Sequence, residues 1–255
     1  MQTNDQISSE EEYSLEESGD VGSSFEEETS MEELSSSEGS EDPQIFTVHT
    51  GECSGTFERV DLILENEMPM VNRAALEEEV REKIFKGIFV WADAESTEDE
   101  PWITAFFAMV PYVDLAGAMF AGVQREVERL GKKERIKLLI NGRFKNVPDD
   151  VVCEMYTALP NCLELDEKER VLLLSLEKPI NPKEEKEIKK VFPTLNLAKM
   201  KNLFPIHSEE VFLYLSNLPA AFTTHGDGSI IKGYLLDKKG LSKFISALRE
   251  YLEAE

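Results

Sequence analysis

Residues 88–92 read Ile-Phe-Val-Trp-Ala, and residues 103–110 read Ile-Thr-Ala-Phe-Phe-Ala-Met-Val. Both runs are short and almost wholly apolar, without the polar alternation of a half-exposed strand. Such runs are typical of strands that are buried on both faces of a sheet. The polar loop 93–100 separates them. The two runs therefore predict central strands of a sheet that helices cover on both sides.

Strand-like and helix-like segments alternate through the rest of the chain. Strands are expected at 45–48, 57–64, 135–140, 171–176 and 230–236, and helices at 72–86, 115–130, 150–159, 182–192, 208–216 and 241–252. Asn181 followed by Pro182 marks one helix start, because asparagine caps helices and proline is favoured at their first position. Strands that alternate with helices imply βαβ units. The sequence predicts an α/β fold with a mixed or mostly parallel sheet and helices on both faces.

The longest apolar stretch, residues 102–123, has about the length of a membrane span. Pro111 and Asp114 interrupt it near the middle, and an unpaired aspartate at a bilayer centre costs about 2.5–3.5 kcal/mol. A buried strand followed by a buried helix explains the stretch better, with Asp114 as the helix N-cap. We therefore expect no membrane span.

Charge divides the chain into two regions. The 255 residues carry 51 acidic and 27 basic side chains, a net charge of −24. Residues 1–43 contain 15 of the acids and no Lys or Arg, together with few large apolar residues. Such a segment cannot bury enough surface to offset its ordering entropy. We expect a disordered acidic tail over 1–43 and one α/β domain over 44–255, with a β-β-α opening segment, 44–87, packed on it.

The acidic tail suggests a protein partner with a basic surface. Tyr13, Leu15 and Phe25 are candidate anchors for a partner's groove, while the surrounding carboxylates meet its basic rim. A tail that only solubilises the chain is the alternative. The net charge argues against unaided nucleic-acid binding, because phosphates would be repelled.

Basic residues gather around the strand expected at 135–140. Lys132, Lys133, Arg143 and Lys145 belong to this group, together with Arg135 and Lys137. If these side chains share a face, they form a positive patch that can bind an acidic segment, including the chain's own tail. Alternatively, nearby acidic residues neutralise them locally. Lys132, Lys133, Arg143 and Lys145 are therefore candidate partner-binding residues, as are the three tail anchors.

Asp93 and Glu95 follow the apolar run 88–92 directly and are the candidate metal ligands. Ligands in α/β sheets bind at the carboxyl ends of strands, and paired carboxylates there can hold a divalent cation. The run resembles the first motif of DEDD-type 3′–5′ exonucleases, which implies two-metal phosphodiester cleavage. The second motif departs from that family, since Lys145 stands where an acid is expected after Asn141. A solvated acidic loop is the alternative reading.

Other catalytic signatures are weak. His225 lies in the glycine-flanked segment Thr224-His225-Gly226-Asp227-Gly228-Ser229, which reads as hairpin punctuation before a strand. Dinucleotide, NTPase and hydrolase-elbow motifs do not occur in the sequence. The three cysteines form no C-x-x-C pair, which favours a reducing compartment, cytoplasmic or nuclear, without structural zinc.

These observations favour a non-enzymatic interaction or regulatory protein, an α/β binding module with an acidic disordered arm that engages basic partners or its own body. No cofactor is expected. The alternative is a metal-dependent phosphodiesterase or nuclease-like enzyme that uses Asp93 and Glu95. A degenerate relative of such an enzyme is included in this alternative. The alternative brings a divalent metal with it. The sequence leaves enzymatic activity undecided and favours a protein without it.

Overall fold

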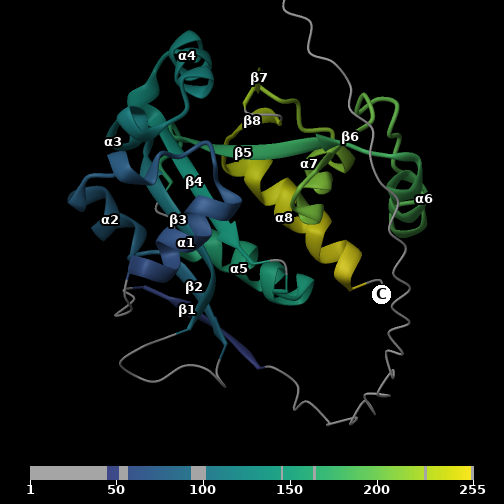
Figure 1. Ribbon diagram of the computed structural model, residues 1–255, viewed down its shortest axis with the longest axis horizontal. Coiled ribbons are helices and arrows are strands. Elements are labelled where there is room, and N and C mark those ends of the chain that lie inside the picture. Colours follow the sequence, from purple (N-terminus) through teal and green to yellow (C-terminus); the bar gives the residue numbers. More distant parts are fainter. Residues whose placement is uncertain are drawn as a thin grey trace, which may run out of the picture. The chain divides into compact units, whose positions relative to one another are not determined.

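A computed structural model of the chain describes residues 45–51, 57–92, 102–144, 146–162, 165–226 and 229–253 (Figure 1). Its strands form one mixed sheet in the order β1-β2-β3-β4-β5-β8-β7, with β6 paired to β5. β4 and β5 run parallel, and the other described pairs are antiparallel. The strands are β1 Phe46–Thr50, β2 Ile88–Ala92, β3 Ile103–Pro111, β4 Ile136–Arg143, β5 Arg170–Pro179, β6 Leu203–Pro205, β7 Phe222–His225 and β8 Ile230–Leu236.

Helices cover both faces of this sheet, as predicted. The α-helices are α1 Phe57–Glu67, α2 Glu78–Ile84, α3 Tyr112–Leu115, α4 Ala121–Leu130, α5 Asp149–Cys162, α6 Pro182–Val191, α7 Val211–Leu215 and α8 Lys238–Leu252. Short 3₁₀ turns are η1 Arg73–Ala75, η3 Ala116–Ala118, η4 Lys133–Arg135 and η5 Ser208–Glu210. The α/β class with a mixed sheet is confirmed.

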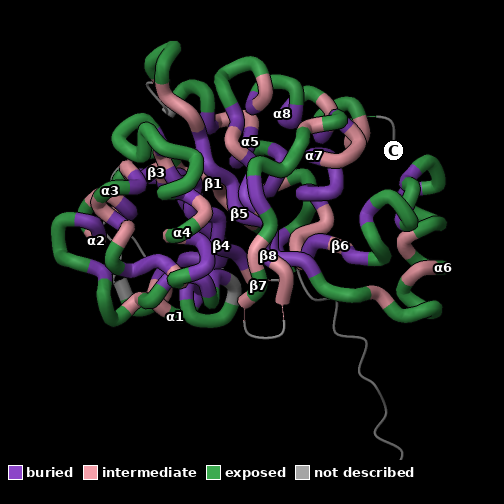
Figure 2. The backbone as a smooth tube through the Cα atoms, turned by 90° about the horizontal axis from the view of Figure 1, so that it is seen from above, coloured by how far each residue is buried: buried purple, intermediate pink, exposed green. Residues whose placement is uncertain are grey.

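The strands separate two apolar cores. Alternate residues of β3 face opposite sides: Phe106 and Ala108 pack with α1, α2 and α4, whereas Ala105 and Phe107 pack with α5, α7 and α8. Figure 2 shows the buried residues concentrated in the strands and the exposed ones in the surrounding helices, α6 in particular. The apolar runs 88–92 and 103–110 are thus central strands with two buried faces.

The strand predicted at 57–64 is wrong, because these residues lie in helix α1. Val60, Ile63 and Leu64 are buried against the sheet, while Leu62 between them is 40% exposed. That spacing of three and four residues follows the helical period. The opening segment 44–87 therefore begins β-α and not β-β-α.

The continuous helix predicted after Asp114 is also wrong. Asp114 lies inside α3 and pairs with Lys83 at 2.6 Å, so it is not an N-cap. Met119 and Phe120 are extended, because Phe120 N–H donates to Met70 O at 2.8 Å and Asn72 N–H donates to Ala118 O at 2.6 Å. These bonds to the chain at 70–72 divide the helix into α3, η3 and α4. The helix predicted at 72–86 is likewise interrupted, at Leu76.

Other local predictions are confirmed. Asn181 caps α6 in a capping box with Glu184, and Gly131, at φ 67°, ends α4. A further cap, not predicted from the sequence, is Asp237, which accepts from Gly240 N–H at 2.7 Å at the start of α8. These boundaries depend on bonds within one turn: side chain to backbone at Asn181 and Asp237, and backbone to backbone at Gly131, whose N–H donates to Glu128 O.

Gly122→Leu is expected to lower the free energy of unfolding by about 1–3 kcal/mol, because overpacking a close contact forces backbone shifts. A Cβ at Gly122 would lie 2.6 Å from Thr224 Oγ1 and 2.7 Å from Phe120 Cε1. Urea denaturation measures the change. Gly117→Leu is the control, because a Cβ there meets nothing within 4 Å. An unchanged midpoint for Gly122→Leu would contradict the contact between α4 and β7.

Candidate functional site

The parallel strands β4 and β5 are paired over only part of their length. Their register runs from Ile136 opposite Arg170 to Leu139 opposite Leu173. The rest of both strands extends beyond this paired stretch towards their carboxyl ends. Ligands of α/β proteins bind at the carboxyl ends of parallel strands. We call the region between these strand ends the β4–β5 wedge.

A buried ion pair occupies the wedge. Arg143, at the end of β4, donates from Nη2 to Glu209 Oε2 of η5 at 2.6 Å. The Arg143 side chain is 9% exposed and that of Glu209 is 4% exposed. Arg143 also donates from Nε to His207 Nδ1 at 3.3 Å, and its Nη1 lies 4.0 Å from Asp149 Oδ1 at the start of α5. The guanidinium thus joins the end of β4 to two segments that follow it in the chain.

A second buried carboxylate lies beside this pair. Glu210 Oε1 accepts from Asn141 Nδ2 of β4 at 3.1 Å, and that nitrogen lies 3.5 Å from the hydroxyl of Tyr156 on α5. Burial, followed by repulsion from Glu209, raises the pKa of Glu210 to about 8, although Ser175 and Asn141 oppose this rise. Glu210 is therefore mainly protonated at neutral pH.

The neighbouring groups titrate away from their ordinary ranges too. Burial raises the pKa of Glu209, while the nearby Arg143 charge opposes this effect. Burial also raises the pKa of Tyr156 well above its usual value. The wedge thus holds one paired carboxylate, one protonated carboxyl group and a neutral phenol.

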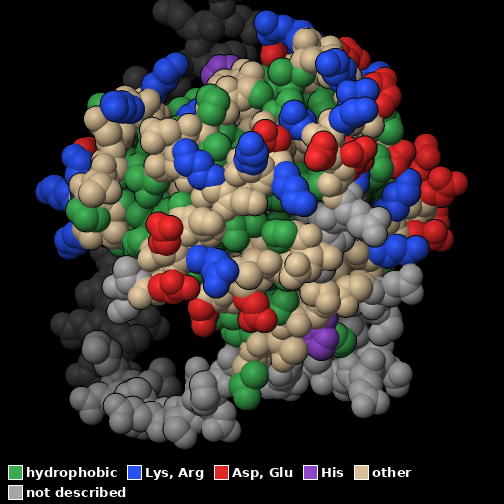
Figure 3. Space-filling model, turned by 180° about the vertical axis from the view of Figure 1, so that it is seen from behind, with side chains coloured by type: hydrophobic (Ala, Val, Ile, Leu, Met, Phe, Trp, Pro, Cys, Tyr) green, Lys and Arg blue, Asp and Glu red, His purple; other side chains and the backbone are tan. Residues whose placement is uncertain are grey.

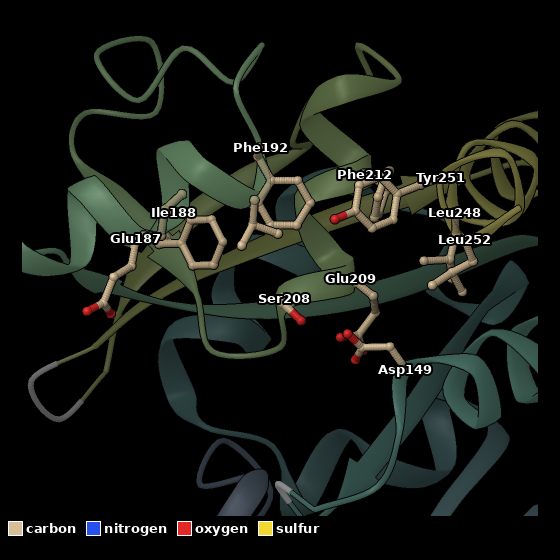
Figure 4. A pocket seen from close by; sticks show the side chains of 12 residues that line it. Asp149, Glu187, Ile188, Phe192, Ser208, Glu209, Phe212, Leu248, Tyr251 and Leu252 are labelled. Carbon is tan, nitrogen blue, oxygen red and sulfur yellow. The ribbon is translucent and has the colours of Figure 1, made fainter. Parts of the chain in front are cut away.

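An apolar pocket of about 390 Å³ opens next to the wedge (Figure 4). Its walls come from α6, η5, α7 and the end of α8, and we call it the α6–α8 pocket. Phe192, Phe212 and Tyr251 line it, with ring centroids 5.2–6.0 Å apart. Figure 4 shows the carboxylates of Asp149 and Glu209 together at one side of this pocket.

The charged residues that line this pocket all carry carboxylates: Asp149, Glu187 and Glu209. Glu209 is compensated by Arg143, whereas the side chain of Asp149 is 65% exposed. The pocket therefore combines an aromatic interior with a negative rim. Chemically, this arrangement suits an apolar side chain that is flanked by cations.

Among the described residues of the predicted basic group, the structure separates Arg143 from Lys132 and Lys133. Lys132 and Lys133 are exposed next to η4, before β4 begins, whereas Arg143 is buried in the wedge at the other end of that strand. Lys137, between them, pairs with Glu169 at 2.9 Å. Arg143 therefore belongs to an internal ion pair and not to a surface patch.

Several candidates lie outside the described residues. These are Tyr13, Leu15 and Phe25 of the tail, the pair Asp93 and Glu95, and Lys145. Elsewhere the hairpin interpretation of the segment around His225 is confirmed, since β7 pairs with β8 and Gly226 N–H donates to Ser229 O at 2.9 Å. Asn141, the start of the incomplete second exonuclease motif, is bonded to Glu210.

Sequence reasoning missed Glu209 and Glu210. The segment Ser208-Glu209-Glu210 before Val211-Phe212-Leu213 looks like an ordinary helix start, with acids in the first turn. One signal was available: residues 211–213, which follow the two acids directly, are all apolar. Three consecutive apolar residues in a helix imply that this turn is buried on all sides. In that case the two acids need buried partners, which Asn141 and Arg143 supply.

The described residues also bear on metal binding and on membrane insertion. Among these residues, no group of three or more His, Cys, Asp or Glu side chains is arranged to hold a metal ion. No described helix has the length and apolar character that a membrane crossing requires. Residues 102–123 instead form β3, α3, η3 and the start of α4, as the strand-then-helix interpretation predicts in outline.

Comparison with known proteins gives one structural relationship of note. No family model matches the chain, and no curated protein sequence matches it. The fold is similar to the crystal structure of BCP1 from Saccharomyces cerevisiae, with a TM-score of 0.52 over 85% of this chain and 92% of that chain. The two sequences are 17% identical over this match. The likeness concerns the fold, and it independently supports the α/β architecture.

Proposed function

We propose that this chain is a non-enzymatic interaction protein whose α6–α8 pocket binds an apolar side chain from a basic segment of a partner protein. The observation that carries the proposal is the pocket's composition: an aromatic interior whose charged lining residues are Asp149, Glu187 and Glu209. Apolar pockets of a few hundred Å³ are typical binding sites. Negative rims favour basic partners through complementary charge.

The charges at the rim set the polarity of the site. Glu187 and Asp149 are the carboxylates that attract cations: Glu209 is paired with Arg143 at 2.6 Å, whereas Asp149, 65% exposed, lies 4.0 Å from the same guanidinium. In this proposal residues 44–255 form the binding domain. The 15 acids of residues 1–43 add longer-range attraction for the same basic partner. The tail thus raises the encounter rate, and the pocket supplies specificity.

The wedge beneath the pocket serves as support in this proposal. Glu210, with its raised pKa, would be a candidate general acid if a substrate reached it. However, Glu210 is 1% exposed, and its Oε1 accepts from Asn141. Arg143 and Glu209 are bonded to each other. These groups hold η5 and α7 in place, so that Phe212 and Ser208 line the pocket.

The test compares two labelled peptides by fluorescence anisotropy on the full chain. Both carry the same apolar side chains at helical spacing, but one is flanked by lysines and the other by glutamates. We expect the basic peptide to bind and the acidic one not to. Glu187→Lys should weaken binding of the basic peptide by about tenfold, because it replaces an attraction at the rim with a repulsion.

The matched control is Glu154→Lys. Glu154 is an exposed residue of α5 outside the pocket lining, so the variant makes the same charge change elsewhere. Val191→Trp, at a residue 52% exposed on the pocket wall, should block binding by filling the entrance. Equal binding of both peptides would contradict the charge selectivity of the pocket. Equal weakening by Glu154→Lys and Glu187→Lys would show that the overall negative charge, that of the acidic tail included, and not the pocket binds the basic peptide.

A further inference from the structure

A second pocket, of about 500 Å³, has the opposite charge. It lies between the loop that follows α6, the end of α7 with the residues after it, and strand β8; we call it the β8 pocket. Its charged lining residues are Lys199 and Lys232, with no carboxylate among the described residues that line it. The two pockets therefore differ in the sign of their charged groups, although the chain as a whole is acidic.

The sequence around the β8 pocket is depleted in acids. Asp and Glu make up 51 of the 255 residues, yet neither occurs in 188–207 or in 211–226, the two stretches that build most of its walls. Lys189, Lys190, Lys199 and Lys201 lie in the first stretch. Seen from behind, the edge of the molecule that carries α6 shows mainly Lys and Arg side chains (Figure 3). The charges of Lys189 and Lys232 are compensated by Glu185 at 2.5 Å and Glu177 at 2.7 Å, so the attraction for an anion centres on Lys199.

The buried carboxylate of Glu177 holds Lys232 in position at the β8 pocket. The ammonium group of Lys232 lies 2.7 Å from Glu177 Oε2, and Glu177 is completely buried on β5. Lys232 also donates to the hydroxyl of Tyr214, which in turn donates to Glu177 Oε1. An ammonium group has three N–H donors, and these two contacts account for two of them. Lys232 is thus held in one place with a donor to spare.

Further donors line the same pocket. Asn196 Oδ1 accepts from Lys199 N–H at 3.1 Å, which leaves the NH₂ end of that amide to donate to a ligand. Asn217, at φ 51°, ends α7 in a left-handed conformation beside it. The remaining wall is apolar, with Leu195, Met200 and Leu218 among its residues. Cationic and amide donors on one side of an apolar wall match a ligand with one anionic group on an apolar body.

We propose that the β8 pocket binds a small molecule of this class: a carboxylate or phosphate carried on an apolar or aromatic body, with its anionic group held by Lys199 and Lys232. This site is separate from the α6–α8 pocket, and its ligand has the opposite charge. If the β8 pocket does not bind such a ligand, the proposal for the α6–α8 pocket is unaffected.

The test uses two dyes with the same aromatic body. 8-Anilinonaphthalene-1-sulfonate carries an anionic group, whereas N-phenyl-1-naphthylamine does not. Fluorescence titration of the full chain should show the anionic dye binding about tenfold more tightly, which is the size of one charge-assisted hydrogen bond. Lys199→Met should abolish this preference. Ala220→Trp, at an exposed residue of the pocket lining, should block both dyes.

Lys168→Met is the matched control, because it removes one charge from an exposed turn outside the pocket. Its dye preference should equal that of the unaltered chain. Equal affinity for the two dyes, equal losses in Lys168→Met and Lys199→Met, or unchanged binding in Ala220→Trp would each overturn the proposal.

Competition identifies the anion. 1-Naphthoate and 1-naphthyl phosphate should each displace the anionic dye, and the stronger competitor shows whether a carboxylate or a phosphate is preferred. A short polyglutamate peptide should not displace it. Displacement by that peptide alone would assign the pocket to an acidic protein segment and overturn the small-molecule proposal.

Discussion

Replacing Arg143 by methionine is expected to lower the free energy of unfolding by about 3–5 kcal/mol, because it leaves a buried carboxylate without its partner. The Glu209 side chain is 4% exposed, and Arg143 Nη2 bonds to it at 2.6 Å. Methionine keeps much of the side-chain length but has no donor. Urea denaturation at neutral pH, with the slope checked for two-state behaviour, measures the loss.

Two comparisons make this prediction specific to the ion pair. Adding Glu209→Gln to Arg143→Met should recover part of the loss, because the uncompensated charge is gone. Arg129→Met should change stability by less than about 1 kcal/mol, since it breaks an exposed pair. The Arg129 side chain is 77% exposed, although it bonds to Glu126 at 2.9 Å. A loss below about 1 kcal/mol for Arg143→Met would mean that Glu209 is solvated or neutral without its partner.

Sequence patterns predicted those parts of the fold that depend on neighbours in the chain. The apolar runs at 88–92 and 103–110 are strands because each buries residues on both faces. The α6 start at Asn181 is set by its bonds to Lys183 and Glu184, two and three residues further on. Signals of this kind are complete within one turn or one strand, so no knowledge of the rest of the molecule is needed.

Predictions failed where distant segments decide the conformation. Residues 57–64 have an apolar run that suits either a strand or a helix, and the sheet surface they pack on makes them α1. The chain is extended at residues 119–120 because Ala118 O accepts from Asn72 N–H and Phe120 N–H donates to Met70 O, about fifty residues earlier in the sequence. Such bonds override helical propensity locally.

The wedge could not be predicted, for a similar reason. Arg143 and Glu209 are 66 residues apart in sequence, and Asn141 and Glu210 are 69 apart. On sequence grounds Arg143 belonged to a cluster of surface cations, since charged residues are rarely buried. Only the bonds between η5 and the end of β4 show that this arginine is internal. The opposite charges of the α6–α8 pocket and the β8 pocket also depend on the assembled fold, because each pocket is lined by segments far apart in the sequence.

Glu210→Gln tests the protonation of the wedge through the pH dependence of stability. The pKa of Glu210 is about 8 in the folded protein and 4.5 as an ordinary side chain. Below pH 4 the carboxyl group is protonated in both states and contributes no pH dependence. Between pH 4.5 and 8 the unfolded chain loses this proton while the folded protein keeps it, so the folded state loses stability as pH rises. Above pH 8 the penalty is constant.

Glutamine cannot ionise but can accept from Asn141 as Glu210 does. We therefore expect Glu210→Gln to become more stable relative to the unaltered chain by about 4–5 kcal/mol between pH 4 and pH 8, at about 1.4 kcal/mol per unit of pKa difference. The groups that face Glu210 are Glu209, Arg143, Ser175, Asn141 and the phenols of Tyr156 and Tyr234.

Urea denaturation of both chains across this pH range measures the difference, with Glu154→Gln as an exposed control that should give a flat profile. A difference that does not change with pH would show that Glu210 is ionised in the folded protein at neutral pH. In that case Arg143 would have to compensate two carboxylates. The loss in Arg143→Met would then exceed the loss expected for the single pair with Glu209, so the two experiments together determine how many charges the wedge holds.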